Sequence, residues 1–325
     1  MALAMPALPA LATNGYFAHG YGLKAKDMGG VATALSQDSF GGANNAASMV
    51  WAGSRMDMGL DCFRPMRSAD RTSAGFSTLN GGVDSDSRNF FIPEFGFNRM
   101  VDEKLSLGIC VHGNSGMNTD CPEGGFNCGG GSANMLCRSG RLGVDLLQIV
   151  IAPTVSYQVA ERQSIGASLL LDYQRFRAEG LQAFDNAPGF PPFKGDPGHV
   201  TNNGYDSARG FGLRVGWQAH PSDALTVAAA NSSKINMSRF DKYSGLFAGH
   251  GDFDIPANYT IGVAWTPSNA WPVAADYVRI AYSKVAAVGN SSSAQSPLGE
   301  DKGPGFGWQD VDVLKLGWRT SGAMR

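Results

Sequence analysis

From about residue 51 onward, bulky apolar side chains alternate with small or polar ones. In YTIGVAW (259–265) the odd positions are Tyr, Ile, Val and Trp, and the even positions are Thr, Gly and Ala. SIGASLLLDY (164–173) and KLSLGICVH (104–112) follow the same rule. Successive side chains of a strand point to opposite faces, so the pattern predicts strands with one apolar face and one small or polar face.

Ten runs of this kind are present, at about 51–67, 87–100, 104–113, 145–159, 163–179, 207–219, 224–240, 256–266, 271–285 and 308–319. Several reach the roughly 9–11 residues that a tilted strand needs to cross a bilayer. Short connections at 101–103, 160–162, 220–223 and 267–270 alternate with long ones at 68–86, 114–144, 180–206, 241–255 and 286–307. Repeated runs of alternating apolar and small or polar residues, joined by alternating short and long connections, are typical of an all-β transmembrane antiparallel β-barrel.

The composition supports export and argues against nucleic acid. Residues 1–12 are almost wholly apolar and end in Ala10-Leu11-Ala12, as the back half of a secretory signal does, so we expect the mature chain to start near Thr13. After residue 12 the sequence contains no run of about 20 apolar residues, so no transmembrane helix is predicted. The 26 basic and 28 acidic residues nearly balance, which is unlike a surface that follows phosphates.

The five cysteines give no zinc pattern, so no metal site is predicted. Cys121, Cys128 and Cys137 share one glycine-rich segment, in which an oxidising compartment would permit a disulfide. The sequence leaves open whether such a bond forms and which two of the three it would join.

Residues 13–48 precede the first strand run and are rich in glycine. Gly20, Gly22 and Ala25 match a dinucleotide-binding fingerprint, and Asp38 could take the role of the ribose-binding acid. That motif requires a βαβ unit, which the surrounding pattern does not provide. A compact polar segment that fills the lumen of a barrel is the better interpretation.

Several stretches together resemble the FadL family of outer-membrane transporters for long-chain fatty acids and aromatic hydrocarbons (OmpP1/FadL/TodX type). They are GYFAHGYGLKAKDMGG (15–30), NNAASM (44–49), GMNTD (116–120), GVDLLQIVIAPTVSY (143–157), GDFDIPANYTIGVAW (251–265), AADYVRIAYS (274–283) and GPGFGWQDVDVLKLG (303–317). The resemblance implies a fourteen-stranded barrel with an N-terminal hatch. With ten runs found, and no aromatic-ended strand before Arg325, we expect the last four strands to be missing. The expected division is a residual signal peptide (1–12), a hatch (13–48) and a C-terminally truncated barrel (49–325).

The resemblance further implies a bacterial outer-membrane protein that takes up hydrophobic compounds passively. Loops would capture the ligand, a pocket would bind it, and movement of the hatch would release it. The expected partners are a fatty acid or hydrocarbon and outer-membrane lipid, with a monomeric protein, no nucleic acid and no cofactor. No nucleophile elbow, HExxH or P-loop motif is present, so no enzyme is predicted. The alternatives are a general porin or structural barrel, and a soluble periplasmic lipid-binding β-protein.

Candidate ligand-binding residues of the hatch are the aromatic Tyr16, Phe17 and Tyr21, with Asn45 carried over from the family's hatch motif. In the loops the apolar candidates are Leu136, Leu142, Leu146, Phe184 and Phe190, and the candidate partners of a ligand carboxylate are Arg138, Arg141 and Lys194. Ordinary packing of the aromatic and apolar residues, and solvation of the charges, are the alternatives. The family usually has proline where this chain has Ala46, which removes a fixed φ and restores an N–H.

Overall fold

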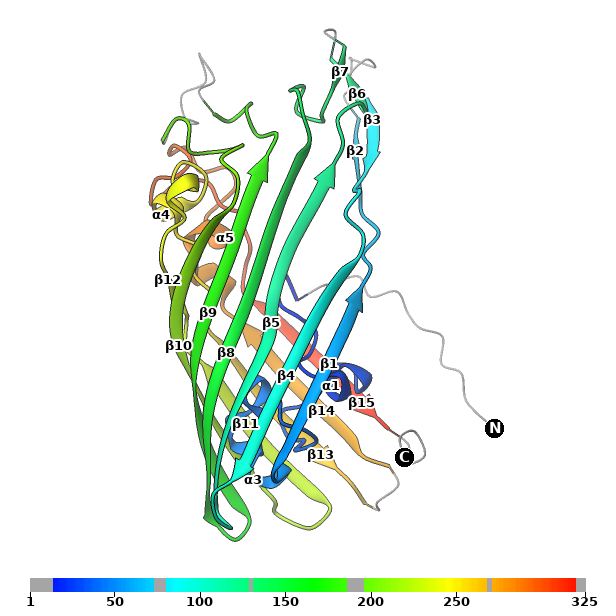
Figure 1. The fold of residues 1–325 in the computed structure, drawn as a ribbon, viewed down its shortest axis with the longest axis vertical. Helices are drawn as coiled ribbons and strands as arrows, with labels where there is room; N and C mark the ends of the chain where they lie inside the picture. Colours follow the sequence, from blue (N-terminus) through cyan, green and yellow to red (C-terminus); the bar gives the residue numbers. More distant parts are fainter. Residues whose placement is uncertain (1–13, 73–79, 129–130, 186–195, 268–270, 320–325) are drawn as a thin grey trace, which may run out of the picture.

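The computed structural model describes residues 14–72, 80–128, 131–185, 196–267 and 271–319. Ten strands form one antiparallel path: β1 (Arg55–Phe63), β4 (Phe90–Met100), β5 (Leu105–Cys121), β8 (Leu142–Ala160), β9 (Gln163–Glu179), β10 (Asp206–Ala219), β11 (Leu225–Ser232), β13 (Asn258–Trp265), β14 (Val273–Ile280) and β15 (Val311–Trp318). β12 (Asn236–Met237) is added beside β10. The tilted strands curve around a lumen (Figure 1). Within the described residues, no ladder joins β1 to β15.

The dyad pattern of the sequence corresponds to the two faces of this sheet, which confirms the predicted barrel-type alternation. On β9, Leu169, Leu171 and Tyr173 are exposed on the outer face. The residues between and beyond them, Asp172 and Gln174 among them, are buried on the lumen side. An apolar exterior around a polar interior is the arrangement that a barrel in lipid requires.

The N-terminal segment lies inside the curve of the sheet, near the end with the short turns (Figure 1). It contains α1 (Leu23–Asp27), α2 (Gly41–Asn44), η1 (Ala46–Ser48) and α3 (Met49–Ala52). α2 contacts β5 and β8, and η1 contacts β8, β9 and β10. Among the described residues, no helix has the length and apolar character needed to cross a membrane.

The predicted loop 114–144 is wrong at both ends. β5 continues through the stretch GMNTD to Cys121, and β8 begins at Leu142, so Leu142 and Leu146 are strand residues. The β5–β8 ladder runs through a register shift between Gly113 and Ser115, where Asn114 is the extra residue. Such a bulge reverses the parity of the side chains, which hides the continuing strand from a search for strict alternation.

The predicted runs 224–240 and 271–285 are too long. β11 ends at Ser232, and β14 ends at Ile280, where the chain turns into η4 (Tyr282–Lys284). The remaining pieces belong to the loops: β2 (Ser68–Arg71) pairs with β3 (Gly81–Asp84), and β6 (Phe126–Asn127) pairs with β7 (Ser132–Ala133). η3 (Asp241–Tyr243), α4 (Ala248–Gly251) and α5 (Ala286–Gly289) complete the loop end.

The cysteine question left open by the sequence has an answer in the loops. Cys128 and Cys137 form a disulfide around the β6–β7 hairpin. Cys121 is a free, buried thiol at the end of β5. The predicted signal segment 1–12 lies outside the described residues.

The ladder between β4 and β5 is incomplete. It joins Phe95–Met100 of β4 to Ser106–Val111 of β5. Beyond Val111, β5 pairs with β8, while residues 90–94 of β4 pair with β1. The described wall therefore has a discontinuity in its hydrogen bonding beside the bulge at Asn114.

Candidate functional site

The lumen near the loops is filled by aromatic rings from three parts of the chain. We call this set the upper aromatic cluster: Tyr16, Phe17, Phe176, Phe240, Tyr243, Phe247, Phe253, Tyr282 and Trp308. Tyr16 is at its centre, with ring centroids 5.2 Å from Tyr282 and 5.8 Å from Phe253. Most of these residues are fully buried, so strand, loop and N-terminal side chains meet away from solvent.

The rings are tightly packed in this conformation. A cavity beside the cluster has a volume of about 50 Å³, and its lining includes Phe17, Tyr21, Arg214 and Asp276. A cavity that holds benzene has about 150 Å³. An aromatic ligand therefore needs side chains of the N-terminal segment or the loops to move.

Tyr21 is buried in a different cluster from Tyr16, while Phe17 packs against both clusters. Its ring packs edge-on against His112, with centroids 4.5 Å apart, and its hydroxyl donates to Oδ1 of Asn114 at 2.8 Å. Tyr21 belongs to a second buried cluster, with Phe40, Val150 and Leu170. The three aromatics thus contact two levels of the lumen.

Asn45 is fully buried and joins the N-terminal segment to β10. Its Nδ2 donates to the carbonyl oxygens of Thr33 (2.9 Å) and Trp217 (3.3 Å), and its Oδ1 accepts from the N–H of Ala47 at 3.1 Å. A Cβ at Gly216 would lie only 2.0 Å from that Oδ1, so this close approach requires glycine. Through these contacts Asn45 has a structural role: it fixes the conformation of the N-terminal segment and attaches it to β10.

The backbone at Asn45 and Ala46 is suited to proline, although alanine is present. Asn45 has φ −145° and ψ 111°, the extended conformation favoured before proline. Ala46 begins η1, and its N–H has no acceptor among the described residues. The missing proline therefore leaves the local geometry intact.

We expect Ala46→Pro to stabilise the protein by about 0.4–1 kcal/mol, because it restricts the unfolded chain without breaking a bond. Thermal unfolding in detergent, followed by the mobility shift on gels, measures the change. The control is Ala47→Pro, which should destabilise because the N–H of Ala47 is bonded to Asn45. A lower transition temperature for Ala46→Pro would contradict the expectation.

Other lumen side chains bind the N-terminal segment mainly through its backbone. Oδ2 of Asp276 accepts from the N–H groups of Ala32 (2.9 Å) and Thr33 (3.1 Å) and from the Thr33 hydroxyl. Arg214 is buried, and its guanidinium donates to the carbonyl of Gly42. Together these bonds fix the segment to β14 and β10.

The same type of contact recurs nearer the short turns. The hydroxyls of Ser156 (3.1 Å) and Ser164 (2.8 Å) both donate to the carbonyl of Ala47. Asn98 donates to the carbonyls of Met49 and Gly53, each at 2.8 Å. On the same strand as Asn98, Glu94 of β4 lies 2.8 Å from the ammonium of Lys26 in α1, which is also 3.1 Å from Asp61 of β1.

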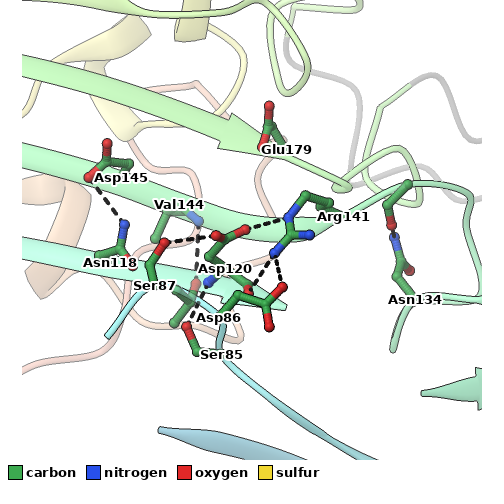
Figure 2. Close-up of polar contacts among 12 residues, drawn as sticks. Ser85, Asp86, Ser87, Asn118, Asp120, Asn134, Arg141, Val144, Asp145 and Glu179 are labelled. Carbon is green, nitrogen blue, oxygen red and sulfur yellow. Dashed lines mark hydrogen bonds and ion pairs between the residues drawn. The ribbon is translucent and has the colours of Figure 1, made fainter. Parts of the chain in front are cut away.

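Arg141, a predicted partner for a ligand carboxylate, already lies between two carboxylates (Figure 2). Its Nε is 2.5 Å from Asp120 and its Nη2 is 2.6 Å from Asp86. Ser87 also donates to Asp120, at 2.7 Å. The hydrogen bonds to Asp120 and Asp86 raise the pKa of Arg141 above its usual range. This group joins the loop before β4 to β5 and β8, and it carries no net positive charge.

The remaining predicted loop residues are spread over the loop end. Leu146 is buried against the upper aromatic cluster. Leu136, Leu142 and Phe184 are half-buried, and Arg138 is exposed with its Nη1 near the carbonyl of Cys137. Phe190 and Lys194 lie outside the described residues.

The sequence-based reasoning missed the loop half of the cluster, namely Phe240, Phe247, Phe253, Tyr282 and Trp308. The feature of the sequence that could have identified them is the presence of aromatic residues within or beside polar, glycine-rich loops, as in GLFAGHGDFD (245–254). Among the residues that the structure describes, no three His, Cys, Asp or Glu side chains come together as metal ligands.

The fold is similar to that of solved transporters. The structure of the Ralstonia pickettii toluene transporter TbuX is 16% identical, with a TM-score of 0.65, over 94% of this chain and 84% of that one. The P. putida toluene transporter TodX is 19% identical, with a TM-score of 0.67, over 94% and 80%. A Pseudomonas aeruginosa FadL homologue is 14% identical, with a TM-score of 0.52, over 82% and 70%.

Among curated protein sequences, none matches this chain. The sequence model described as Outer membrane protein transport protein (OMPP1/FadL/TodX) matches residues 10–318. That span includes the N-terminal segment and all ten strands of the path. The chain therefore belongs to the OMPP1/FadL/TodX family of outer-membrane transport proteins, is located in the bacterial outer membrane, and has an N-terminal hatch inside its β-barrel.

Proposed function

We propose that this protein carries uncharged hydrophobic compounds, monoaromatic hydrocarbons foremost, passively across the outer membrane. The observation that supports this most is the upper aromatic cluster, in which Tyr16 and Phe17 of the hatch pack directly against loop aromatics. A ligand that replaces one ring in such a cluster gains the same apolar burial, about 25 cal/mol per Å². The solved toluene transporters TbuX and TodX, which share this fold, agree with that ligand class.

In this proposal, ligand binding and hatch movement are coupled through Tyr16, Phe17 and Leu146. The loops capture the ligand, whose ring then displaces the hatch aromatics from the cluster. Tyr16 is held by an edge-to-face contact with the ring of Tyr282, and the Tyr282 hydroxyl donates to the carbonyl of Asn14, two residues before Tyr16, at 2.6 Å. Displacement at this point loosens the chain that leads to α1.

The loop charges favour an uncharged ligand over a carboxylate. Arg141 is neutralised by two carboxylates, and Lys234 is paired with Asp254. Arg138 is exposed at the rim, where a single ion pair contributes about 0–1 kcal/mol. A fatty acid would therefore gain little from its charged end at the described loops.

We further propose that release occurs at the β4–β5 discontinuity. The hatch covers it from inside: the N–H of Ala18 donates to the carbonyl of Asn114 at 3.2 Å, and Tyr21 binds the same residue. Withdrawal of these two contacts would uncover the bulge without breaking the sheet ladder. The alternative of a general porin fits less well, because the cavity beside the packed hatch, among the described residues, has a volume of only about 50 Å³.

The test is uptake by cells of a strain that lacks its own transporter of this family. Expression of the chain should raise the initial rate of radiolabelled toluene uptake several-fold, with saturation, and leave uptake of a small neutral sugar unchanged. Oleate should be taken up more slowly than toluene. Equal stimulation of sugar and toluene would instead support the porin, and stimulation of oleate alone would overturn the proposed ligand class.

A further inference from the structure

A band of buried polar side chains crosses the lumen wall between the two apolar clusters. We call it the polar belt: His112 and Asn114 of β5, Gln148 of β8, and Asp172 and Gln174 of β9. Each is at most 4% exposed. Gln148 pairs with Gln174 across the β8–β9 ladder, and Asn114 donates to Gln148 at 3.1 Å. The belt is therefore continuous from the bulge to β9.

Apolar residues border the belt on both sides. Towards the loops, Leu146 and Phe176 belong to the upper aromatic cluster. Towards the short turns, Leu170 belongs to the cluster that contains Tyr21, as does Val150, which pairs with His112 and Asp172 in the same row of the sheet. A hydrophobic molecule that passes from the upper cluster to the bulge at Asn114 must cross this level.

Asp172 and Gln174 of the belt have buried acceptor oxygens without a donor, and Nε2 of His112 also has no hydrogen-bond partner among the described residues. Within the described residues, neither carboxylate oxygen of Asp172 has a hydrogen-bond partner, and Asp172 forms no ion pair. Oε1 of Gln174 is also without a donor, although its Nε2 bonds to the carbonyl of Phe253 at 3.1 Å. A buried acceptor without a donor costs about 1–3 kcal/mol, and more when it is charged, so the site favours a ligand that donates.

The hatch itself shows which chemistry fits the belt. The phenolic hydroxyl of Tyr21 donates to Oδ1 of Asn114 at 2.8 Å, while its ring rests on His112. Withdrawal of the hatch would free this acceptor as well. A ligand with an aromatic ring and a hydroxyl could then reproduce the contacts that Tyr21 makes.

We propose that the polar belt binds the hydroxyl group of a hydroxylated hydrophobic ligand, a phenol or an alcohol, with Asp172 as the acceptor that selects it. The proposal rests on the proposed function, since the ligand reaches the belt only when the hatch aromatics move. Compounds that have no hydrogen-bond donor pass the polar belt without forming a hydrogen bond to it.

The experiment is equilibrium binding of p-cresol, toluene and 4-methylanisole to the purified protein in detergent, with partition into empty micelles subtracted. The variants are D172L, which removes the acceptor, and D172N, which keeps one acceptor oxygen. The matched control is S106A, which removes another fully buried oxygen without a partner, at a lumen position outside the belt.

We expect the wild type to bind p-cresol about tenfold more tightly than toluene or 4-methylanisole, the size expected for one net hydrogen bond to a buried acceptor oxygen. D172L should remove this preference and leave toluene binding unchanged, D172N should retain most of it, and S106A should retain all of it. Equal weakening of p-cresol and toluene by D172L, no change at all, or an equal loss in D172N and D172L would overturn the selective role of Asp172. If the wild type binds none of the three compounds, the proposed function fails too, whereas toluene binding that is independent of Asp172 refutes this inference alone.

Discussion

A disulfide between Gly42→Cys and the native Cys110 is expected to stop transport until it is reduced. A Cβ at Gly42 would lie 2.9 Å from Sγ of Cys110, close to the roughly 3 Å between these atoms across a disulfide. Cys110 is buried in β5, and Gly42 lies in α2. The bond would join the hatch covalently to the wall beside the release point that we propose.

Thr154 must be shortened for this bond to form, because the same Cβ would lie 2.5 Å from its Oγ1. The test variant is therefore G42C/T154A, and G42C/T154A/C110S is the matched control that cannot cross-link. Toluene uptake should fall at least about tenfold in the oxidised test variant, recover with a reductant, and stay constant in the control. Mass spectrometry after thiol blocking confirms that the bond is present. Normal uptake by a fully cross-linked protein would show that α2 does not move.

Lys26→Met is expected to be the most damaging single substitution in the hatch. The ammonium of Lys26 contacts Glu94, whose side chain is 1% exposed, and Asp61. Removal of one member of a buried ion pair leaves an uncompensated charge and costs about 3 kcal/mol. Methionine keeps most of the side-chain volume, so the loss is electrostatic. Urea unfolding in lipid vesicles measures the stability, and hydrogen exchange over residues 23–27 reports the release of α1.

Two further variants separate this ion pair from a general effect of charge. K26M/E94Q should recover more than half of the lost stability, because the buried carboxylate is gone. Lys24→Met should cost far less, since that ammonium binds only the carbonyl of Gln37, at 2.8 Å, among the described residues. Equal losses from Lys24→Met and Lys26→Met would show that Glu94 does not depend on Lys26.

The barrel could be predicted from the sequence because a strand in lipid has a strict period. Leu169, Leu171 and Tyr173 face outward at every second position, and each of the ten runs overlaps one strand of the observed path. Where the chain leaves that constraint, the prediction failed. The bulge at Asn114 concealed the outer half of β5, and Leu142, which was assigned to a loop, is the first residue of β8.

The candidate site was predictable only in its hatch half. Tyr16 and Phe17 stand out in a short glycine-rich segment, whereas Phe247 and Phe253 lie in a loop whose folding back into the lumen has no local period. Arg141 shows the opposite difficulty: its charge was visible in the sequence, but its two partners, Asp86 and Asp120, come from other parts of the chain. The pattern of residues along a sequence does not show which distant segments will pair in the folded chain.

The bonds between wall and hatch have a consequence for how the sequence can vary. Ser156, Ser164 and Arg214 all donate to carbonyl groups of the hatch backbone rather than to its side chains. Every residue type supplies a carbonyl, so these contacts constrain the wall residues more than the hatch residues that they hold. Over evolutionary time the hatch can therefore change its ligand-facing side chains, and with them the range of compounds admitted, while it keeps the same position and the same wall contacts inside the barrel.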